Sequence, residues 1–296
     1  MTAAERGFLL LTSHLGNPER KPLTDAQLRM LTQRMFQAKR SVEERDLCPE
    51  DLVALGYAKE MAQRIVDLLN EEQSLQWYLR QGKLAGCVPL TRVSDNYPVL
   101  ARQRLGGESV GCLWAKGNLD LLNYRAISLV GSREINPENQ KFAEEVGKQA
   151  AMQGFVLISG NARGADRAAQ DACLANGGAV ISVVADELSD KLPNDRMLYL
   201  SEDEFDSPFS PQRALHRNHM IHAMGEKLFV AQATLRSGGT WDGTAKNLRF
   251  GWSPVYCFRD GSEAAETLIQ MGAEPVERSE LCDFEQLPQA ITFFSK

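Results

Sequence analysis

The sequence is poor in the features that mark secreted, membrane-spanning or zinc-binding proteins. Its six cysteines are scattered along the chain and none stands in a C-x-x-C pair, which favours reduced thiols over a disulfide framework or a structural zinc site. No apolar run approaches the roughly 20 residues that a membrane-spanning helix needs. The first residues also lack the charged-then-apolar pattern of a signal peptide. We therefore expect a cytoplasmic protein with no membrane partner.

An excess of positive charge is also absent. Lysine and arginine number 33 against 39 acidic residues, which gives a net charge of −6. A protein that binds nucleic acid non-specifically over its surface is usually basic. Because this chain is acidic overall, it could bind a polyanion only through a local basic patch. A hydrophobic content of 43% and a charged content of 24% are typical of a globular protein. The length of 296 residues allows one large domain or two ordinary ones.

Several ligand-binding motifs are missing. No segment predicts a P-loop, a nucleophile elbow or the paired carboxylates of a hydrolase. The G-x-G-x-x-G fingerprint is absent, and no acidic residue stands where the ribose of a dinucleotide would need one. These absences disfavour NAD binding, and we expect neither a cofactor nor catalysis.

A histidine-rich segment is present, but its spacing does not predict a metal site. His216, His219 and His222 are three residues apart, so on a helix they would drift around its surface instead of converging on one ion. Together with Arg213 and Arg217, they predict a basic helix face near a binding crevice. The alternative is an ordinary solvated face. No metal is expected.

The first part of the chain predicts helices. Apolar residues recur at helical spacing from about Asp25 to Leu84, with Thr24 or Asp25 as a cap and glycines between segments. We predict a small SAM- or helix-hairpin-like domain over residues 1–84. Such modules contact nucleic acid or a partner, or they cap a larger domain; the sequence leaves both roles open. The expected helices after the first one are Pro49–Leu55 and Ala58–Leu79.

From residue 85 to 296 strands and helices alternate. This pattern predicts a Rossmann-like α/β domain with a doubly wound, mainly parallel sheet. The expected strands are Cys87–Leu90, Cys112–Ala115, Ile127–Val130, Phe155–Ile158, Ala179–Ala185, Lys227–Ala231 and Pro254–Phe258. The expected helices are Gln140–Gln153, Asp166–Ala175, Gln212–Met224, Thr244–Phe250 and Ser262–Met271.

The stretch Ala126–Asp166 has the pattern of a βαβ unit. Its two apolar runs each end at a glycine-containing turn, and a helical pattern separates them. Arg133 follows the first turn and Arg163 follows the second. Ligands of open α/β sheets bind at the carboxyl ends of the strands, where helix N-termini also favour anions. We therefore expect both guanidinium groups to approach one phosphate-binding crevice.

Each turn carries groups suited to a phosphate. Gly131-Ser132 offers backbone N–H groups and a hydroxyl, and Ser159–Asp166 adds two glycines that permit close backbone approach. In the second turn Asp166 is expected to cap the helix or to orient Arg163. A third turn, Ser237–Thr240, is expected before a helix that begins near Gly243-Thr244. Each turn alone could be a plain strand-to-helix connection, but the three together predict a shared anion site.

These stretches resemble the DNA-processing protein A family, DprA or Smf. The resemblance runs from about Asp51 to Val276. It is carried by Asn96-Tyr-Pro98, Leu113–Leu122, Val130–Arg133, Ser159-Gly160, Ala162–Gly164, Asp166, Arg217-Asn218 and Ser237-Gly238. It implies a Rossmann-like fold and a pocket that receives a DNA phosphate. The site residues it implies, with those added from the turns, are Gly131, Ser132, Arg133, Ser159, Gly160, Arg163, Gly164, Asp166, Arg217, Asn218, Ser237 and Gly238.

The resemblance implies a non-catalytic protein that binds single-stranded DNA and loads a RecA-type recombinase during DNA uptake, transformation or recombination. A homodimer is left open. The alternatives are a sensor of a signalling nucleotide and a phosphoribohydrolase of the related lysine-decarboxylase-like family. That enzyme would need a positioned carboxylate, for which Asp242 is the candidate.

Overall fold

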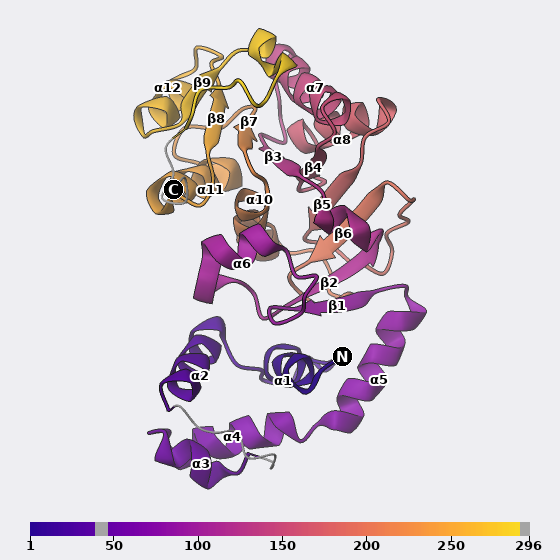
Figure 1. Cartoon of the computed structure of the whole chain (residues 1–296), viewed down its shortest axis with the longest axis vertical. Helices are drawn as coiled ribbons and strands as arrows, with labels where there is room; N and C mark the ends of the chain where they lie inside the picture. The colour runs from indigo at the N-terminus through magenta and orange to yellow at the C-terminus, as the bar shows by residue number, and fades with distance from the viewer. Residues whose placement is uncertain (39–46, 291–296) are drawn as a thin grey trace.

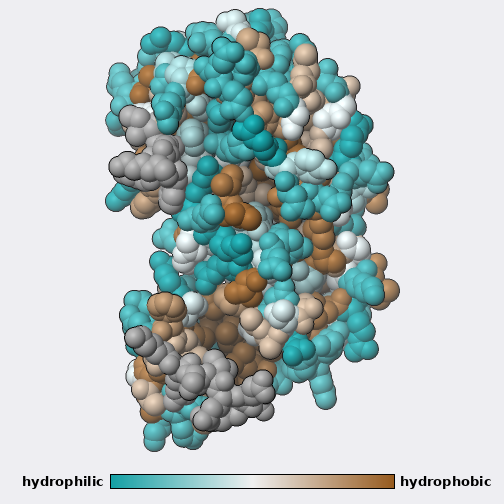
Figure 2. All heavy atoms as spheres, viewed as in Figure 1, coloured by the Kyte–Doolittle hydropathy of each residue, from teal (hydrophilic) through white to brown (hydrophobic). Residues whose placement is uncertain are grey.

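The computed structural model of the chain describes residues 1–38 and 47–290. Five helices lie together in one half of the molecule, and a sheet flanked by helices forms the other half (Figure 1). On the face shown in Figure 2, the surface over the sheet half is mostly hydrophilic, and hydrophobic side chains gather over the helical half and around the junction.

The described strands form a single sheet in the order β1-β2-β6-β5-β4-β3-β7-β8-β9. β1 and β2 are antiparallel to each other, β2 is antiparallel to β6, and the remaining pairs are parallel. The predicted doubly wound, mainly parallel α/β sheet is therefore confirmed. The bounds are β1 (Val88–Thr91), β2 (Cys112–Gly117), β3 (Ala126–Val130), β4 (Val156–Ser159), β5 (Val180–Val184), β6 (Met197–Ser201), β7 (Leu228–Val230), β8 (Val255–Phe258) and β9 (Glu274–Val276).

Helices cover both faces of the sheet, and each face has its own core. In β3, Ala126 and Val130 belong to one core, while Ile127 and Leu129 belong to the other, because side chains alternate along a strand. α7 and α8 cover one face, and α6, α10, α11 and α12 cover the other. Their bounds, with that of α9, are α6 (Val99–Leu105), α7 (Pro137–Met152), α8 (Ala165–Ala175), α9 (Pro211–His216), α10 (Asn218–Met224), α11 (Gly238–Phe250) and α12 (Glu263–Gln270).

Several elements differ from the sequence prediction. The predicted helix Gln212–Met224 is two helices, α9 and α10, which meet at Arg217. The strands β6 and β9 and the helix α6 were not predicted. β9 contains Glu274 and Pro275 and pairs only with β8 among the described strands, so its residues need no apolar alternation.

The N-terminal half contains α1 (Ala3–Thr12), α2 (Asp25–Gln37), α3 (Pro49–Ala54), α4 (Lys59–Leu69) and α5 (Glu72–Leu84). α1 was not predicted; it begins with a capping box between Thr2 and Glu5. The helices share a core that includes Leu28, Leu52 and Ile65. A second cluster joins α1 and α5 to β2. Because apolar packing continues across the junction, the division into domains at residues 84 and 85 stays a prediction.

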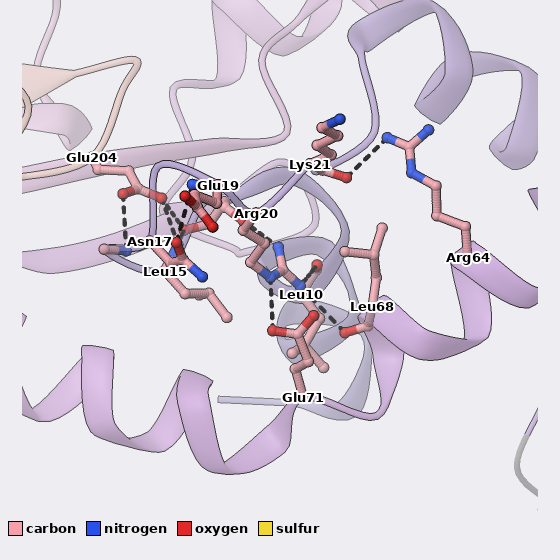
Figure 3. Close-up of polar contacts among 12 residues, drawn as sticks. Leu10, Leu15, Asn17, Glu19, Arg20, Lys21, Arg64, Leu68, Glu71 and Glu204 are labelled. Atoms are coloured by element: carbon pink, nitrogen blue, oxygen red, sulfur yellow. Dashed lines mark hydrogen bonds and ion pairs between the residues drawn. The ribbon is translucent and has the colours of Figure 1, made fainter.

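One carboxylate connects the two halves. Glu204, which follows β6, accepts hydrogen bonds from the Ser13 hydroxyl (2.6 Å) and from the backbone N–H groups of Leu15 (2.7 Å) and Gly16 (3.1 Å). It also accepts from the Tyr78 hydroxyl of α5 at 3.2 Å. Figure 3 shows Glu204 facing the loop that carries Leu15. Glu204 therefore contacts both α5 and the loop after α1, and Asp206 also accepts from the Tyr78 hydroxyl, at 2.8 Å.

The same loop is held from within the helical half by Arg20. Its buried guanidinium donates to the carbonyl oxygens of Leu10 and Leu68 and pairs with Glu71 at 3.0 Å (Figure 3). Because these partners come from α1, α4 and the start of α5, one side chain ties three helices together. None of the helices within residues 1–38 and 47–290 is long and apolar enough to cross a membrane.

Candidate functional site

A cavity of about 860 Å³ lies at the carboxyl ends of β3 and β7. From β3 the chain winds outward through β4, β5 and β6, and it then returns to the other side of β3 to form β7, β8 and β9. This reversal is the topological switch point of the sheet, where open α/β folds bind their ligands. We call this cavity the crevice. Its walls are the loop after β3, the loop before α8, the junction of α9 and α10, and the start of α11.

The loop after β3 is fastened to the loop after β7. Gly131 packs so tightly that a β-carbon would overlap that of Ala165. The backbone N–H of Ser132 donates to the carbonyl oxygen of Gln232 at 3.0 Å, and the Ser132 hydroxyl lies 3.3 Å from the same oxygen. The side chain of Gln232 accepts from the N–H of Asn136. Sequence reasoning missed Gln232, because only its place after an apolar strand marks it.

Arg217 lies at the centre of the site. It is 6% exposed, and Nη1 donates to the carbonyl oxygen of Val183 at 2.8 Å. The guanidinium covers Gly160 so closely that a β-carbon there would collide with it. Its Nε is buried without a hydrogen-bond partner among the described residues. Burial lowers the pKa of Arg217, because the charged form loses hydration.

Asp166 orders the loop in front of Arg217. Its Oδ2 accepts the backbone N–H groups of Gly160 (3.1 Å) and Ala162 (3.3 Å). Burial raises the pKa of this carboxyl, and the charge of Arg217 opposes that rise. The prediction that Asp166 orients Arg163 is replaced by this backbone role. Arg163 lies instead 3.8 Å from the exposed Glu134, a pair that contributes little in water.

Arg133 and Arg163 stand together at the rim. Both side chains are exposed, and both line the crevice as well as an adjoining cavity of about 290 Å³. Arg217 also lines both cavities, so three guanidinium groups lie between them. The adjoining cavity extends towards Asn161, which adopts a left-handed backbone conformation at φ 57°. The structure thus brings the two predicted arginines to one wall.

The third predicted turn is the first turn of α11. The predicted helix start near Gly243 is therefore wrong, because α11 begins at Gly238 and runs for 13 residues. Ser237 is its N-cap residue and makes no side-chain capping hydrogen bond. Asn218 borders this turn and donates to the carbonyl oxygen of Gly239 at 3.1 Å. The start of α11, which has no side-chain cap from Ser237, therefore lines the crevice.

Three of the predicted site residues do not line the crevice: Ser159, Gly164 and Gly160, the last of which lines only the adjoining cavity. Ser159 is fully buried, and its hydroxyl accepts a hydrogen bond from Gln170 at 2.5 Å. Gly164, at φ 87°, packs against the carbonyl oxygens of Ser132 and Arg133, where no β-carbon fits. Ser159 therefore supports the interior, and Gly164 allows two loops of the wall to approach each other.

The predicted basic helix face is wrong, because its members point to different partners. Arg213 donates to Asp203 at 2.5 Å, and His216 lies 2.6 Å from Glu202. His222 is fully buried, and burial lowers its pKa to about 3. The kink between α9 and α10 separates these side chains, so only Arg217 of this set lies in the crevice.

Residues Gly107–Gly111 match the G-x-S-x-G sequence pattern of a nucleophile elbow, although no elbow was predicted. Ser109 is 3% exposed, and its hydroxyl donates to the carbonyl oxygen of Ala101. The segment leads from a helical turn into β2, whereas an elbow joins a strand to a helix. It therefore supplies no nucleophile. Among the described residues, no group of three or more His, Cys, Asp or Glu is placed to hold a metal ion.

Comparison with known proteins identifies the family. The family model described as DNA recombination-mediator protein A matches residues 89–285, which is more than half of the chain. The chain belongs to this family. The matched region begins at β1 and includes every wall of the crevice that the geometry defines.

Two relatives show how far this family member resembles other proteins. It is 31% identical over 189 residues to the DNA processing protein DprA of Streptococcus pneumoniae. That match covers 58% of this chain and 66% of the relative. It is 28% identical over 216 residues to a protein of Mycobacterium tuberculosis named as a putative DprA, covering 64% and 55%. In both cases the match spans less than two thirds of the relative's own length.

Solved structures support the fold. The crystal structure of DprA from Streptococcus pneumoniae superposes with a TM-score of 0.69 at 24% identity, covering 93% of this family member and 95% of that chain. DprA from Helicobacter pylori, whose structure is described as giving insight into a single-stranded DNA binding mode, superposes with a TM-score of 0.54 at 22% identity. That match covers 64% of this chain and 90% of the other. At these identities the likeness establishes the shared fold.

Proposed function

We propose that this family member is a DNA-processing protein that binds single-stranded DNA through the phosphates of its backbone. The observation that carries this proposal is the cluster of Arg133, Arg163 and Arg217 at the carboxyl edge of the sheet. Arginine suits phosphate because its planar donors can bind two oxygens at once. The overall charge of −6 makes this local cluster the basic patch that the sequence required.

The names of related proteins support single-stranded DNA as the ligand. The names of the relatives and the description of the Helicobacter pylori structure refer to DNA processing and to single-stranded DNA. We infer the same ligand class here, with RecA-type recombinase loading as the downstream role and the helical residues 1–84 as a separate domain. A homodimer remains a prediction.

We also propose that the site breaks no bond. The buried carboxylate of the crevice, Asp166, already accepts two backbone hydrogen bonds. Glu134 is exposed and lies beside Arg163. Asp242, which the phosphoribohydrolase alternative requires, is an exposed residue of α11 outside the crevice lining. A general acid or base must lie within hydrogen-bonding reach of its substrate, so this arrangement favours binding.

Fluorescence anisotropy with labelled oligo-dT, titrated at several salt concentrations, tests the proposal. We expect the affinity to fall steeply with salt, because each neutralised phosphate releases counterions. The substitution Arg163→Ala should weaken binding and should reduce the slope of log K against log salt by about 0.7 for each lost phosphate contact.

A matched control is available on the sheet half. Arg278 is exposed and lies after β9, outside the crevice lining. The substitution Arg278→Ala changes the net charge by the same amount but should leave the affinity and the salt slope close to wild type. Equal effects of the two substitutions, or no effect of Arg163→Ala, would refute the assignment of the crevice.

A further inference from the structure

The crevice is closed at its inner end. Its lining includes Val130 at the end of β3 and Ile221 of α10, which are 5% and 1% exposed. Gly131 lies beside them against Ala165, with no room for a β-carbon. A ligand therefore enters from the rim and stops at an apolar floor.

Two groups with a positive electrostatic potential line the crevice. The first is the start of α11, a 13-residue helix whose N-cap Ser237 makes no side-chain capping bond. The second is Arg217, which is 6% exposed, with one nitrogen bonded to Val183 and Nε lacking a partner among the described residues. Both line the crevice. A buried guanidinium and a helix start together favour an anion of high charge.

A strand end fits this shape better than an internal phosphate. An internal phosphodiester carries one negative charge and a sugar on each side, so both neighbouring nucleotides would have to enter with it. A phosphate monoester at the end of a strand carries about −1.5 to −2 charges near neutral pH and has a sugar on one side only. It can therefore reach Arg217 while the rest of the strand stays outside.

We propose that the crevice holds the terminal phosphate monoester of a DNA strand. This inference rests on the proposed function and adds the part of the strand that the crevice selects. The following nucleotide leaves over the rim into the adjoining cavity, which shares Arg133, Arg163 and Arg217 with the crevice. Arg133 and Arg163 then bind internal phosphates, and the inner end of the crevice binds the terminal one.

Four oligo-dT ligands of equal length test the proposal with the full chain: a 5′-phosphorylated strand, a 3′-phosphorylated strand, a strand with hydroxyls at both ends, and a covalently closed circle. We expect at least one phosphorylated strand to bind about tenfold more tightly than the last two, from the added charge-assisted hydrogen bonds. Equal affinity for all four would overturn the inference and leave the proposed function standing. Binding of none would refute the proposed function itself.

Competition with thymidine monophosphate separates a strand end from a free nucleotide. The mononucleotide should displace the labelled phosphorylated strand more effectively than thymidine does, because it carries the same monoester. If it displaces the strand while terminal phosphates give no gain in affinity, the crevice serves a free nucleotide and the strand-end inference is wrong.

Two substitutions locate the selectivity. Thr240→Val, at the first turn of α11, removes a hydroxyl from the lining with little change in shape. Arg217→Gln removes the buried charge, and thermal unfolding must first show that this variant folds. Either variant should reduce the preference for the phosphorylated strand at least threefold. Arg163→Ala should weaken all four ligands alike and leave the preference unchanged. A preference that survives Thr240→Val and a folded Arg217→Gln would overturn the assignment.

Discussion

The guanidinium of Arg217 occupies the space where a β-carbon of residue 160 would stand. Gly160 directly follows β4, and Arg217 lies between α9 and α10, more than fifty residues later in the sequence. The two residues therefore meet only in the folded chain. The pair places a buried positive charge at the switch point of the sheet. A change of the glycine alone therefore tests the role of this charge in binding, provided that the stability of the variant is measured beside it.

We expect Gly160→Ala to displace Arg217 and to weaken binding of oligo-dT by about tenfold or more, because the added methyl collides with the guanidinium. Anisotropy titration measures the affinity, and thermal unfolding reports any loss of stability. Gly7→Ala, in α1, is the matched control, since nothing lies within 4 Å of a β-carbon there. Wild-type affinity of a folded Gly160→Ala protein would contradict the role given to Arg217.

His216 of α9 and His222 of α10 should make stability depend on pH in opposite directions, and the lowered pKa of His219 adds to the effect of His222. Burial lowers the pKa of His222 from 6.5 to about 3, so its contribution is present above pH 6.5 and is lost as the pH falls towards 3. The hydrogen bond to Glu202 raises the pKa of His216 to about 9, so its contribution is present below pH 6.5 and is lost as the pH rises through 9.

Urea unfolding from pH 4 to 9.5 measures this profile. Each fully linked proton changes the unfolding free energy by about 1.4 kcal/mol per pH unit, and the half-exposed His216 should contribute less. His216→Gln should flatten the alkaline side, and it should also change the acidic side, because Glu202 loses the hydrogen bond that lowers the pKa of its buried carboxyl. An unchanged alkaline slope in His216→Gln would rule out this assignment.

The hydrogen bonds to Glu204 should hold the helical half against the sheet half. Glu204→Ala leaves the N–H groups of Leu15 and Gly16 and the hydroxyls of Ser13 and Tyr78 without this acceptor. We expect a loss of about 2–4 kcal/mol, measured by urea unfolding. Asp171→Ala, at an exposed position of α8, removes a carboxylate away from the junction and should change stability by less than about 0.5 kcal/mol.

Nucleoside monophosphates should remain intact with this protein. Asp242 is outside the crevice lining, so it is not placed to activate water at the N-glycosidic bond of a nucleotide held there. Chromatography of adenosine monophosphate incubated with the protein should show no free adenine above a protein-free control. Release of adenine that disappears in Asp242→Asn would establish the enzymatic alternative instead.

The parts of the site that follow strands could be predicted from the sequence, and the parts that depend on distant pairing could not. Gly131 and Arg133 come directly after an apolar run, and the carboxyl ends of parallel strands share one edge. The interior role of Ser159 depends on Gln170, and the fastening role of Gln232 depends on Ser132. Neither partner leaves a periodic pattern in the sequence.

The break at Arg217 shows the same limit. Apolar and basic residues continue at helical spacing across Gln212–Met224, so the pattern predicts one helix. One helix ends and the next begins at Arg217, whose side chain donates to the carbonyl oxygen of Val183 in β5. Burial of an arginine is uncommon, and no local propensity signals it.

Arg217 has one further consequence, which concerns how the protein can change. Its side chain donates a hydrogen bond to the carbonyl oxygen of Val183 in β5 and also lines the crevice. A substitution at this position therefore alters the fold and the surface together. Arg133 and Arg163 are exposed and carry no comparable internal bond in the described structure. Selection for weaker DNA binding in the laboratory should therefore recover replacements at positions 133 and 163 well before any at position 217.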